Sequence, residues 1–222
     1  MDLNFSVFQE PRGVMRVLHL IFSISAFASV TEFGGSVTFN CKFDNKPSEY
    51  VYKYDYPFQL NLNDHELNPG NITECHPKVS IIGDFSSDAR FFVATGVLAL
   101  LFTLAIIFVY AKFDNMYKTN NQVPLIDFVI TVIFAVLWLS SSAAWANGLS
   151  GLKHATDSNT IGWKGINDTC KKCPVSISAF STLNISVVLG FLNFFLWAAD
   201  LWFVYKETAW FQGNQGVITS GV

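Results

Sequence analysis

The sequence predicts an α-helical membrane protein, a bundle of four transmembrane helices that carries a small disulfide-tied β-sheet outside the membrane. Three observations support this fold class. Charged residues are 14% of the 222 residues, whereas soluble domains have roughly 25%. Uncharged runs recur at the length needed to cross a bilayer. Between the first two runs, apolar and polar residues alternate with a period of two, which is typical of strands.

The composition also excludes other classes of protein. Apolar residues are 51% of the chain and the net charge is −3, which excludes intrinsic disorder. The sequence pI is 5.7 and no run of basic residues is present, which argues against nucleic-acid binding. The apolar content is therefore best accommodated by lipid.

Three long apolar runs contain no charged residue. They occupy residues 91–110, 128–146 and 175–199. About 20 apolar residues cross the hydrocarbon core as a helix, and none of these runs has the polar face of a helix in a soluble protein. With their flanks, the predicted spans are 90–111, 124–147 and 174–205.

The first apolar run is shorter and has two interpretations. Arg16 and His19 lie within it. It is either a span over residues 14–33, whose Arg16 side chain reaches up to the lipid headgroups, or a signal peptide within 12–33 that is cleaved at the small residues 26–28. The long segment before it contains acidic residues, which favours an uncleaved span.

The cysteines predict which side of the membrane each loop occupies. All four lie in two predicted loops, 34–89 and 148–173, which two spans separate. The two loops therefore share a side, and disulfides persist in oxidising compartments. We expect both loops to be lumenal or extracellular. The tail 1–13, the loop 112–123 and the tail 206–222 are then cytosolic.

The glycosylation sequons agree with this orientation. Asn71 and Asn167 each begin an Asn-x-Ser/Thr sequon in a cysteine-containing loop. Asn71 lies in a predicted turn away from the membrane and is expected to carry a glycan, whereas Asn167 is close to the last span. Asn4 is predicted to be cytosolic and Asn184 to lie within a helix, so we expect both to stay unmodified.

The first loop carries strand signals. Residues 50–60 place tyrosines, then Phe58 and Leu60, at every second position, which predicts one strand with one apolar face. Residues 37–43 and 79–82 predict two further strands. Pro57 predicts an edge strand, because proline cannot donate to a ladder. We expect the sheet to bury its tyrosine row; an exposed row would be a docking surface.

The spacing of the cysteines leaves their pairing open. Pairing within each loop keeps each bond local and predicts Cys41–Cys75 and Cys170–Cys173, although four cysteines also allow pairing between loops. A Cys41–Cys75 bond closes a loop of about 35 residues and contributes about 4 kcal/mol in the chain-entropy model. Alternatively, Cys170 and Cys173 form a redox pair at a helix start, where thiolate is favoured. The protein would then be a membrane thiol–disulfide oxidoreductase.

Polar residues within the spans are functional candidates by default. Asp200 lies near the cytosolic end of the last span, at a depth similar to Arg16 and His19, so we expect an Arg16–Asp200 ion pair. Asn193 lies near mid-membrane and is expected to bond across helices. Asp127 is interpreted as a favourable charge at a helix N-terminus. A proton path, or a vesicle pore or transporter, is the alternative for this set.

Small residues repeat at helical spacing in two spans. Ser140, Ala144 and Gly148 recur every four residues in the third span, and Ser186 and Gly190 do so in the fourth. Such faces let helices approach closely in lipid. We expect the Ser140 face to lie inside the bundle, with packing between copies as the alternative.

No catalytic motif is present in the sequence, and its histidines lack metal-ligand spacing. The protein is therefore predicted to be non-enzymatic and to need no metal or cofactor. Leu104, Tyr110 and Lys112 fit a loose cholesterol-binding pattern, which suggests cholesterol as a bound lipid.

Several longer runs carry a family resemblance and cover nearly the whole chain. They are EPRG at 10–13, YPFQL at 56–60, GDFSSDARFFV at 83–93, PLIDF at 124–128, SSSAAWANGL at 140–149, ATD at 155–157 and FLNFFLWAADLWFVYKETAW at 191–210. Together they resemble the synaptophysin family, within the MARVEL-type four-span vesicle proteins. Two departures stand out: relatives tend to have Asn at the position of Asp200, and their last-loop cysteines are further apart than Cys170 and Cys173.

The resemblance implies a location and a set of partners. It implies a multi-pass protein of synaptic or other secretory and transport vesicles, with both termini cytosolic. It implies that the chain organises the vesicle membrane and associates with the vesicle SNARE synaptobrevin in exocytosis and endocytosis. It further implies contact with cholesterol-rich bilayer, homo-oligomers and a complex with the vesicular proton-pumping ATPase.

Overall fold

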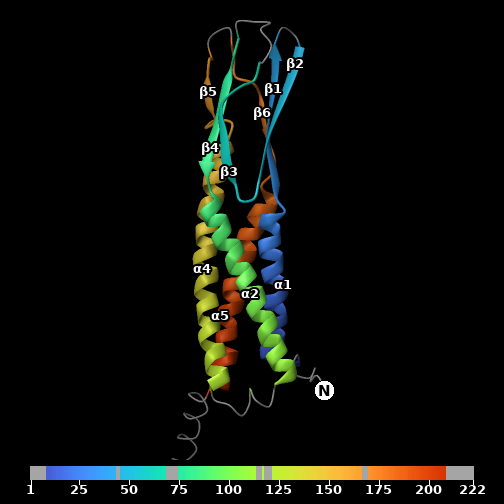
Figure 1. The fold of residues 1–222 in the computed structure, drawn as a ribbon, viewed down its shortest axis with the longest axis vertical. Coiled ribbons are helices and arrows are strands. Elements are labelled where there is room, and N and C mark those ends of the chain that lie inside the picture. The colour runs from blue at the N-terminus through green and yellow to red at the C-terminus, as the bar shows by residue number, and fades with distance from the viewer. Residues whose placement is uncertain are drawn as a thin grey trace, which may run out of the picture. The chain divides into compact units, whose positions relative to one another are not determined.

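The computed structural model describes residues 9–43, 46–68, 75–113, 117, 122–166 and 170–208. The chain divides into two compact units (Figure 1). The helical unit is made of Met1–Ala28, Phe92–Ala143 and Ser186–Val222. The strand unit is made of Ser29–Phe91 and Ala144–Ile185.

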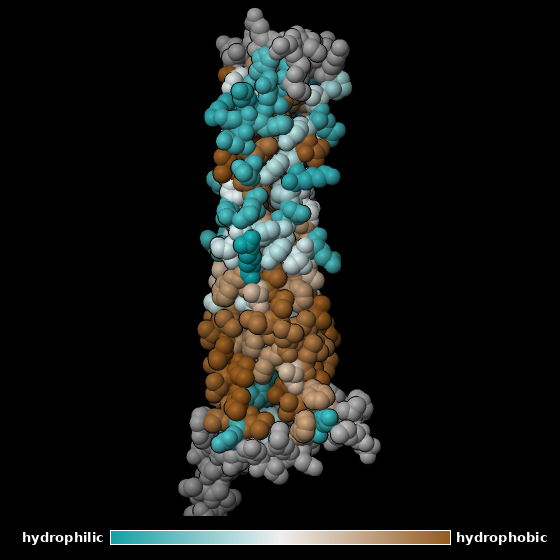
Figure 2. Space-filling model, in the orientation of Figure 1, coloured by the Kyte–Doolittle hydropathy of each residue, from teal (hydrophilic) through white to brown (hydrophobic). Residues whose placement is uncertain are grey.

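Within the part of the chain that the structure describes, four helices are long and apolar enough to cross a membrane. They are α1 (Pro11–Thr31), α2 (Ser86–Lys112), α4 (Gln122–Thr156) and α5 (Ser181–Glu207). Their large apolar side chains point outward: Leu101, Val136 and Val188 are 58%, 60% and 66% exposed. Figure 2 shows this as a continuous brown surface on the helices, against a mostly teal surface on the strands. Such a surface is stable against hydrocarbon, so the predicted four-span fold class is confirmed.

The third span is longer than predicted. α4 continues beyond residue 147 to Thr156, and Gly148 and Gly151 lie within the helix. Their bare backbones allow other side chains to pack directly on the helix: Asp88 contacts Gly148 and Phe85 contacts Gly151. The segment from 148 to 156 is therefore helix rather than loop.

The strand unit contains two three-stranded antiparallel sheets, with strand orders β2-β1-β6 and β3-β4-β5. The strands are β1 (Gly34–Phe43), β2 (Lys46–Asp55), β3 (Gln59–Glu66), β4 (Lys78–Asp84), β5 (Gly162–Lys164) and β6 (Val175–Ile177). The segment between α4 and α5 thus supplies one strand to each sheet. Two of the expected strands, 37–43 and 79–82, lie within β1 and β4.

The period-two run from 50 to 60 is not one strand, so that prediction is wrong. The chain turns after β2 and returns as β3, with Pro57 and Phe58 in the turn rather than on an edge strand. Pro57 offers no N–H to a ladder, and Phe58 adopts a positive φ of 68°. The tyrosine row is partly buried: Tyr54 is 4% exposed, and Tyr50 and Tyr52 are half-buried.

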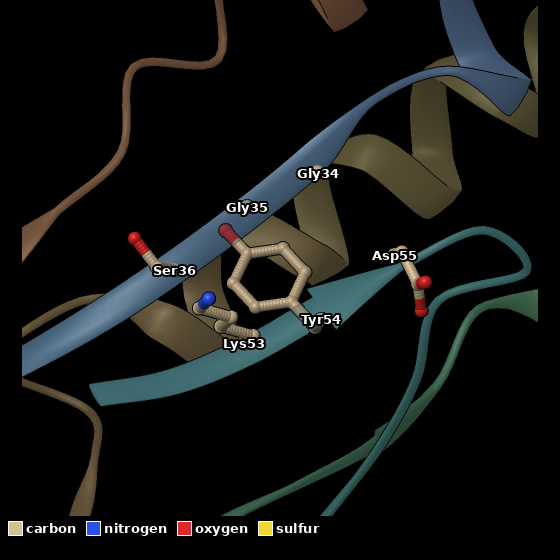
Figure 3. Close-up of a pocket in the computed structure, with 6 residues that line it drawn as sticks. All are labelled: Gly34, Gly35, Ser36, Lys53, Tyr54 and Asp55. Carbon is tan, nitrogen blue, oxygen red and sulfur yellow. The ribbon is translucent and has the colours of Figure 1, made fainter. Parts of the chain in front are cut away.

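A hollow of about 420 Å³ lies where β1 begins (Figure 3). It is lined by Gly34, Gly35, Ser36, Lys53, Tyr54 and Asp55. The Tyr54 ring lies against the backbone of Gly35, where any Cβ would collide with it. Burial of the Tyr54 hydroxyl raises its pKa to about 12. Gly35 is therefore fixed by this close approach of an aromatic ring.

Two disulfides join the two cysteine-containing segments, which corrects the predicted pairing within each segment. Cys41 bonds Cys173, and Cys75 bonds Cys170. The cause is strand pairing: β6 lies beside β1 in register Phe39 to Val175, which brings the neighbouring cysteines together. The bonds span 132 and 95 residues in sequence. In the chain-entropy model, either bond alone contributes about 5 kcal/mol.

Candidate functional site

A buried ionic cluster in the helical unit is the candidate site. α1 supplies Arg16 and His19, one turn apart on the same face. α2 supplies Tyr110, α4 supplies Asp127 and Thr131, and α5 supplies Trp197 and Asp200. Tyr117 comes from the segment between α2 and α4. Each of these side chains is at most 1% exposed. Helical spacings of three and four residues place each pair from α1, α4 and α5 on one side of its helix.

Arg16 is the centre of this cluster. Its Nη2 donates to Asp127 Oδ1 at 2.7 Å and to Thr131 Oγ1 at 3.0 Å. Its Nη1 lies 3.0 Å from Asp200 Oδ2, so the predicted ion pair is present in the structure. The guanidinium also lies over the Trp197 ring, 5.4 Å from its centroid, which is a cation–π distance. The expectation that Arg16 extends to the headgroups is wrong, because the side chain is fully buried.

Asp127 is a second partner that the sequence reading missed. Its Oδ2 accepts hydrogen bonds from Tyr110 Oη at 2.5 Å and Tyr117 Oη at 3.0 Å. With Arg16 on Oδ1, the carboxylate has three donors, so it is more than a charge at a helix start. Outside the spans, burial and the neighbouring Tyr110 and Asp127 raise the pKa of Tyr117 above its ordinary value. In the sequence, the one feature that pointed to Asp127 as a buried partner was its position beside an apolar run.

Asp200 is less well satisfied than Asp127. Besides the Arg16 contact, His19 Nδ1 lies 3.9 Å from Asp200 Oδ2. The His19 ring stacks on Trp197 with centroids 4.1 Å apart and planes 7° apart. Neither ring nitrogen makes a hydrogen bond of normal geometry within the described part of the chain, and the backbone of Leu196 is a polar neighbour of the ring.

Asn193 and the small residues of α5 hold helices together within this unit. Asn193 Nδ2 donates to the Phe22 carbonyl of α1 at 3.1 Å, which is the expected bond across helices. Gly190 packs against Ser142 of α4 and Phe92 of α2, leaving no room for a Cβ. Ser186 is also buried. The small residues of α5 therefore serve close packing, as helices in lipid require.

The small-residue face of α4 is not where it was predicted. Ser140 is exposed, and its hydroxyl donates back to the Val136 carbonyl of its own helix. Ala144 is half-buried and Gly148 is buried in the strand unit. The expectation that all three face the inside is wrong at Ser140. A hydroxyl satisfied by its own backbone does not need a helix partner.

The structure removes the basis for a Cys170–Cys173 redox pair. These cysteines bond to Cys75 and Cys41 rather than to each other. The following helix begins only at Ser181, with a strand in between, so no helix N-terminus adjoins the motif. A low thiol pKa from a helix terminus therefore has no structural support.

The glycosylation sequons and the cholesterol pattern have different outcomes. Asn4, Asn71 and Asn167 lie outside the described residues, and Asn184 lies in α5, where it accepts a hydrogen bond from Lys153 at 2.6 Å. Tyr110 of the cholesterol pattern is 1% exposed. This tyrosine is used within the helical unit and does not present its ring to lipid.

These features define the class of protein as a multi-pass membrane protein with a cross-linked strand unit. The family model described as MARVEL, membrane-associating domain, matches residues 8–203. The chain belongs to this family.

Proposed function

We propose that this MARVEL protein acts without catalysis in the membranes of synaptic or other secretory vesicles, as a synaptophysin-like organiser that associates with synaptobrevin. The sequence runs at 83–93, 140–149 and 191–210 support the synaptophysin branch. The geometric observation that carries the proposal is the separation of charge and apolar surface. The described charged groups of the inner span faces, Arg16, Asp127 and Asp200, are buried in one cluster, while large apolar side chains cover the outside. Such a surface meets lipid and other helices.

The two disulfides support an orientation with the strand unit in the lumen and both termini in the cytosol. They join segments that are far apart in sequence, and such bonds persist in an oxidising compartment. The glycan proposed at Asn71 follows from the same orientation. A glycosidase-sensitive mass shift that disappears in Asn71→Gln supports it, and one that disappears only in Asn4→Gln reverses it.

The outward face of α4 is the proposed contact surface for synaptobrevin or for a second copy. Ile133, Val136 and Ser140 are exposed along it. Ser140 is the smallest of the three and permits a partner helix to approach closely. Cholesterol and the vesicular proton-pumping ATPase are further proposed partners at the membrane-facing surface.

A substitution on this face tests the proposal. Ser140→Leu should leave monomer yield unchanged, because the side chain points outward, and should reduce co-purification of synaptobrevin or of a tagged second copy from the same detergent extract. Val188→Leu is the matched control, since Val188 is an exposed apolar residue of α5. Full partner recovery with Ser140→Leu would contradict the assignment of this face.

A further inference from the structure

Among the side chains that the structure describes, the buried cluster carries an uncompensated charge. It contains one guanidinium, from Arg16, and two carboxylates, from Asp127 and Asp200. With His19 neutral, its formal charge is −1. All four side chains are at most 1% exposed. An unpaired charge in such a place is strongly destabilising even after the protein relaxes.

Asp200 is the carboxylate of the cluster that lacks sufficient positive charge and hydrogen-bond donors around it. Asp127 accepts three hydrogen bonds, from Arg16, Tyr110 and Tyr117. Asp200 has the Arg16 Nη1 contact at 3.0 Å, and neither of its oxygens makes a hydrogen bond of normal geometry to the described residues. A buried carboxylate in this state lacks most of the donors that water would supply.

His19 lies where that charge is needed. Its Nδ1 is 3.9 Å from Asp200 Oδ2, and its ring is stacked on Trp197. We propose that His19 and Asp200 together bind one proton, taken from water at the membrane face where α1 begins. The bound proton converts the cluster into two cations facing two carboxylates. His19 lies eight residues into α1, about 12 Å along the helix axis, so the path from that face is short.

The groups around the pair favour uptake of a single proton. The charged and titratable neighbours in the described part of the cluster are Arg16 of α1, Tyr110 of α2, Asp127 of α4, and Tyr117 from the segment between α2 and α4. Arg16 repels a proton on His19, whereas the two carboxylates attract it. Once charged, the imidazolium donates toward Asp200 and lies on the Trp197 face as a cation–π contact. Loss of the proton leaves −1 buried between α1 and α5, so raising the pH should loosen this contact.

Trp197 fluorescence reports the proton directly, because an imidazolium stacked on an indole quenches its emission. The full chain is placed in lipid nanodiscs, and the difference between the wild type and Trp197→Phe isolates the emission of this tryptophan. We expect Trp197 emission to be quenched at low pH and to recover as the pH rises from about 5 to about 8, the range in which histidines titrate.

Three variants complete the test. His19→Gln and Asp200→Asn should each remove the pH-dependent step, while His154→Gln, which removes an exposed histidine of the strand unit, should retain it. Persistence of the step in His19→Gln or in Asp200→Asn would overturn the proposal. Emission from wild-type Trp197 that does not change with pH would overturn it without reference to any variant, so a misfolded variant does not decide the outcome.

Discussion

Replacing Arg16 with methionine tests how the helical unit tolerates charge. Arg16→Met keeps side-chain length and removes the one cation that contacts Asp127 at 2.7 Å and Asp200 at 3.0 Å. Two buried carboxylates then lose their guanidinium partner. Removing one partner of a buried ion pair typically costs 3–5 kcal/mol, so we expect a loss of about 3–5 kcal/mol in the free energy of unfolding.

The assay is equilibrium unfolding of the protein in lipid nanodiscs at neutral pH. The control is Arg90→Met, which removes an exposed arginine from α2 and should change the unfolding free energy by less than about 0.5 kcal/mol. A triple variant that adds Asp127→Asn and Asp200→Asn to Arg16→Met removes the orphaned charges and should recover most of the loss. An Arg16→Met protein as stable as the control, or a triple variant less stable than the single one, would refute the reasoning.

The packing at Gly190, the pairing of the cysteines and the surface charge of Asp64 can each be tested. Gly190→Leu should overpack the helical unit and lower the unfolding free energy by about 1–3 kcal/mol or more, whereas Val188→Leu on the exposed face should be neutral; equal effects in nanodisc unfolding would contradict the packing. Non-reducing peptide mapping should yield a Cys41–Cys173 peptide, and a bond within either loop would contradict the sheet topology. A hydrogen bond from Lys164 holds the pKa of Asp64 below its ordinary value. The contribution of this contact to the stability of the strand unit is therefore present above about pH 4 and is lost as the pH falls. Asp64→Asn should reduce the acid sensitivity of the strand unit, and an unchanged acid transition would argue against this contact.

The sequence predicted the spans well because lipid imposes a strict length and apolarity. The helix boundaries were harder. Val175 and Ile177 extend an apolar run and were therefore predicted to belong to the last helix, yet they form an edge strand. They do so because β1 offers them backbone hydrogen bonds, which the local sequence does not indicate. The Cys41–Cys173 bond follows from that same pairing, so an error in one strand became an error in the disulfides.

The candidate site was predicted in part for similar reasons. Arg16 and Asp200 could be matched from their depth in neighbouring spans, since each lies alone among apolar residues. Asp127 could not be matched, because its three donors come from elements brought together only by folding. The inward placement predicted for Ser140 was wrong because the spacing of small residues defines a helical face but not the direction in which it points. The Ser140 hydroxyl can lie outside the bundle because it donates to a carbonyl of its own helix.

Immuno-isolation of intact vesicles tests the central functional claim most directly. Vesicles are captured through the cytosolic part of synaptobrevin, and the bound and unbound membranes are assayed for this protein before and after detergent extraction. We expect the protein to be enriched in the captured vesicles and to stay associated with synaptobrevin in mild detergent, and we expect Ser140→Leu to weaken that association. Recovery of the protein only in membranes that lack synaptobrevin would contradict the account.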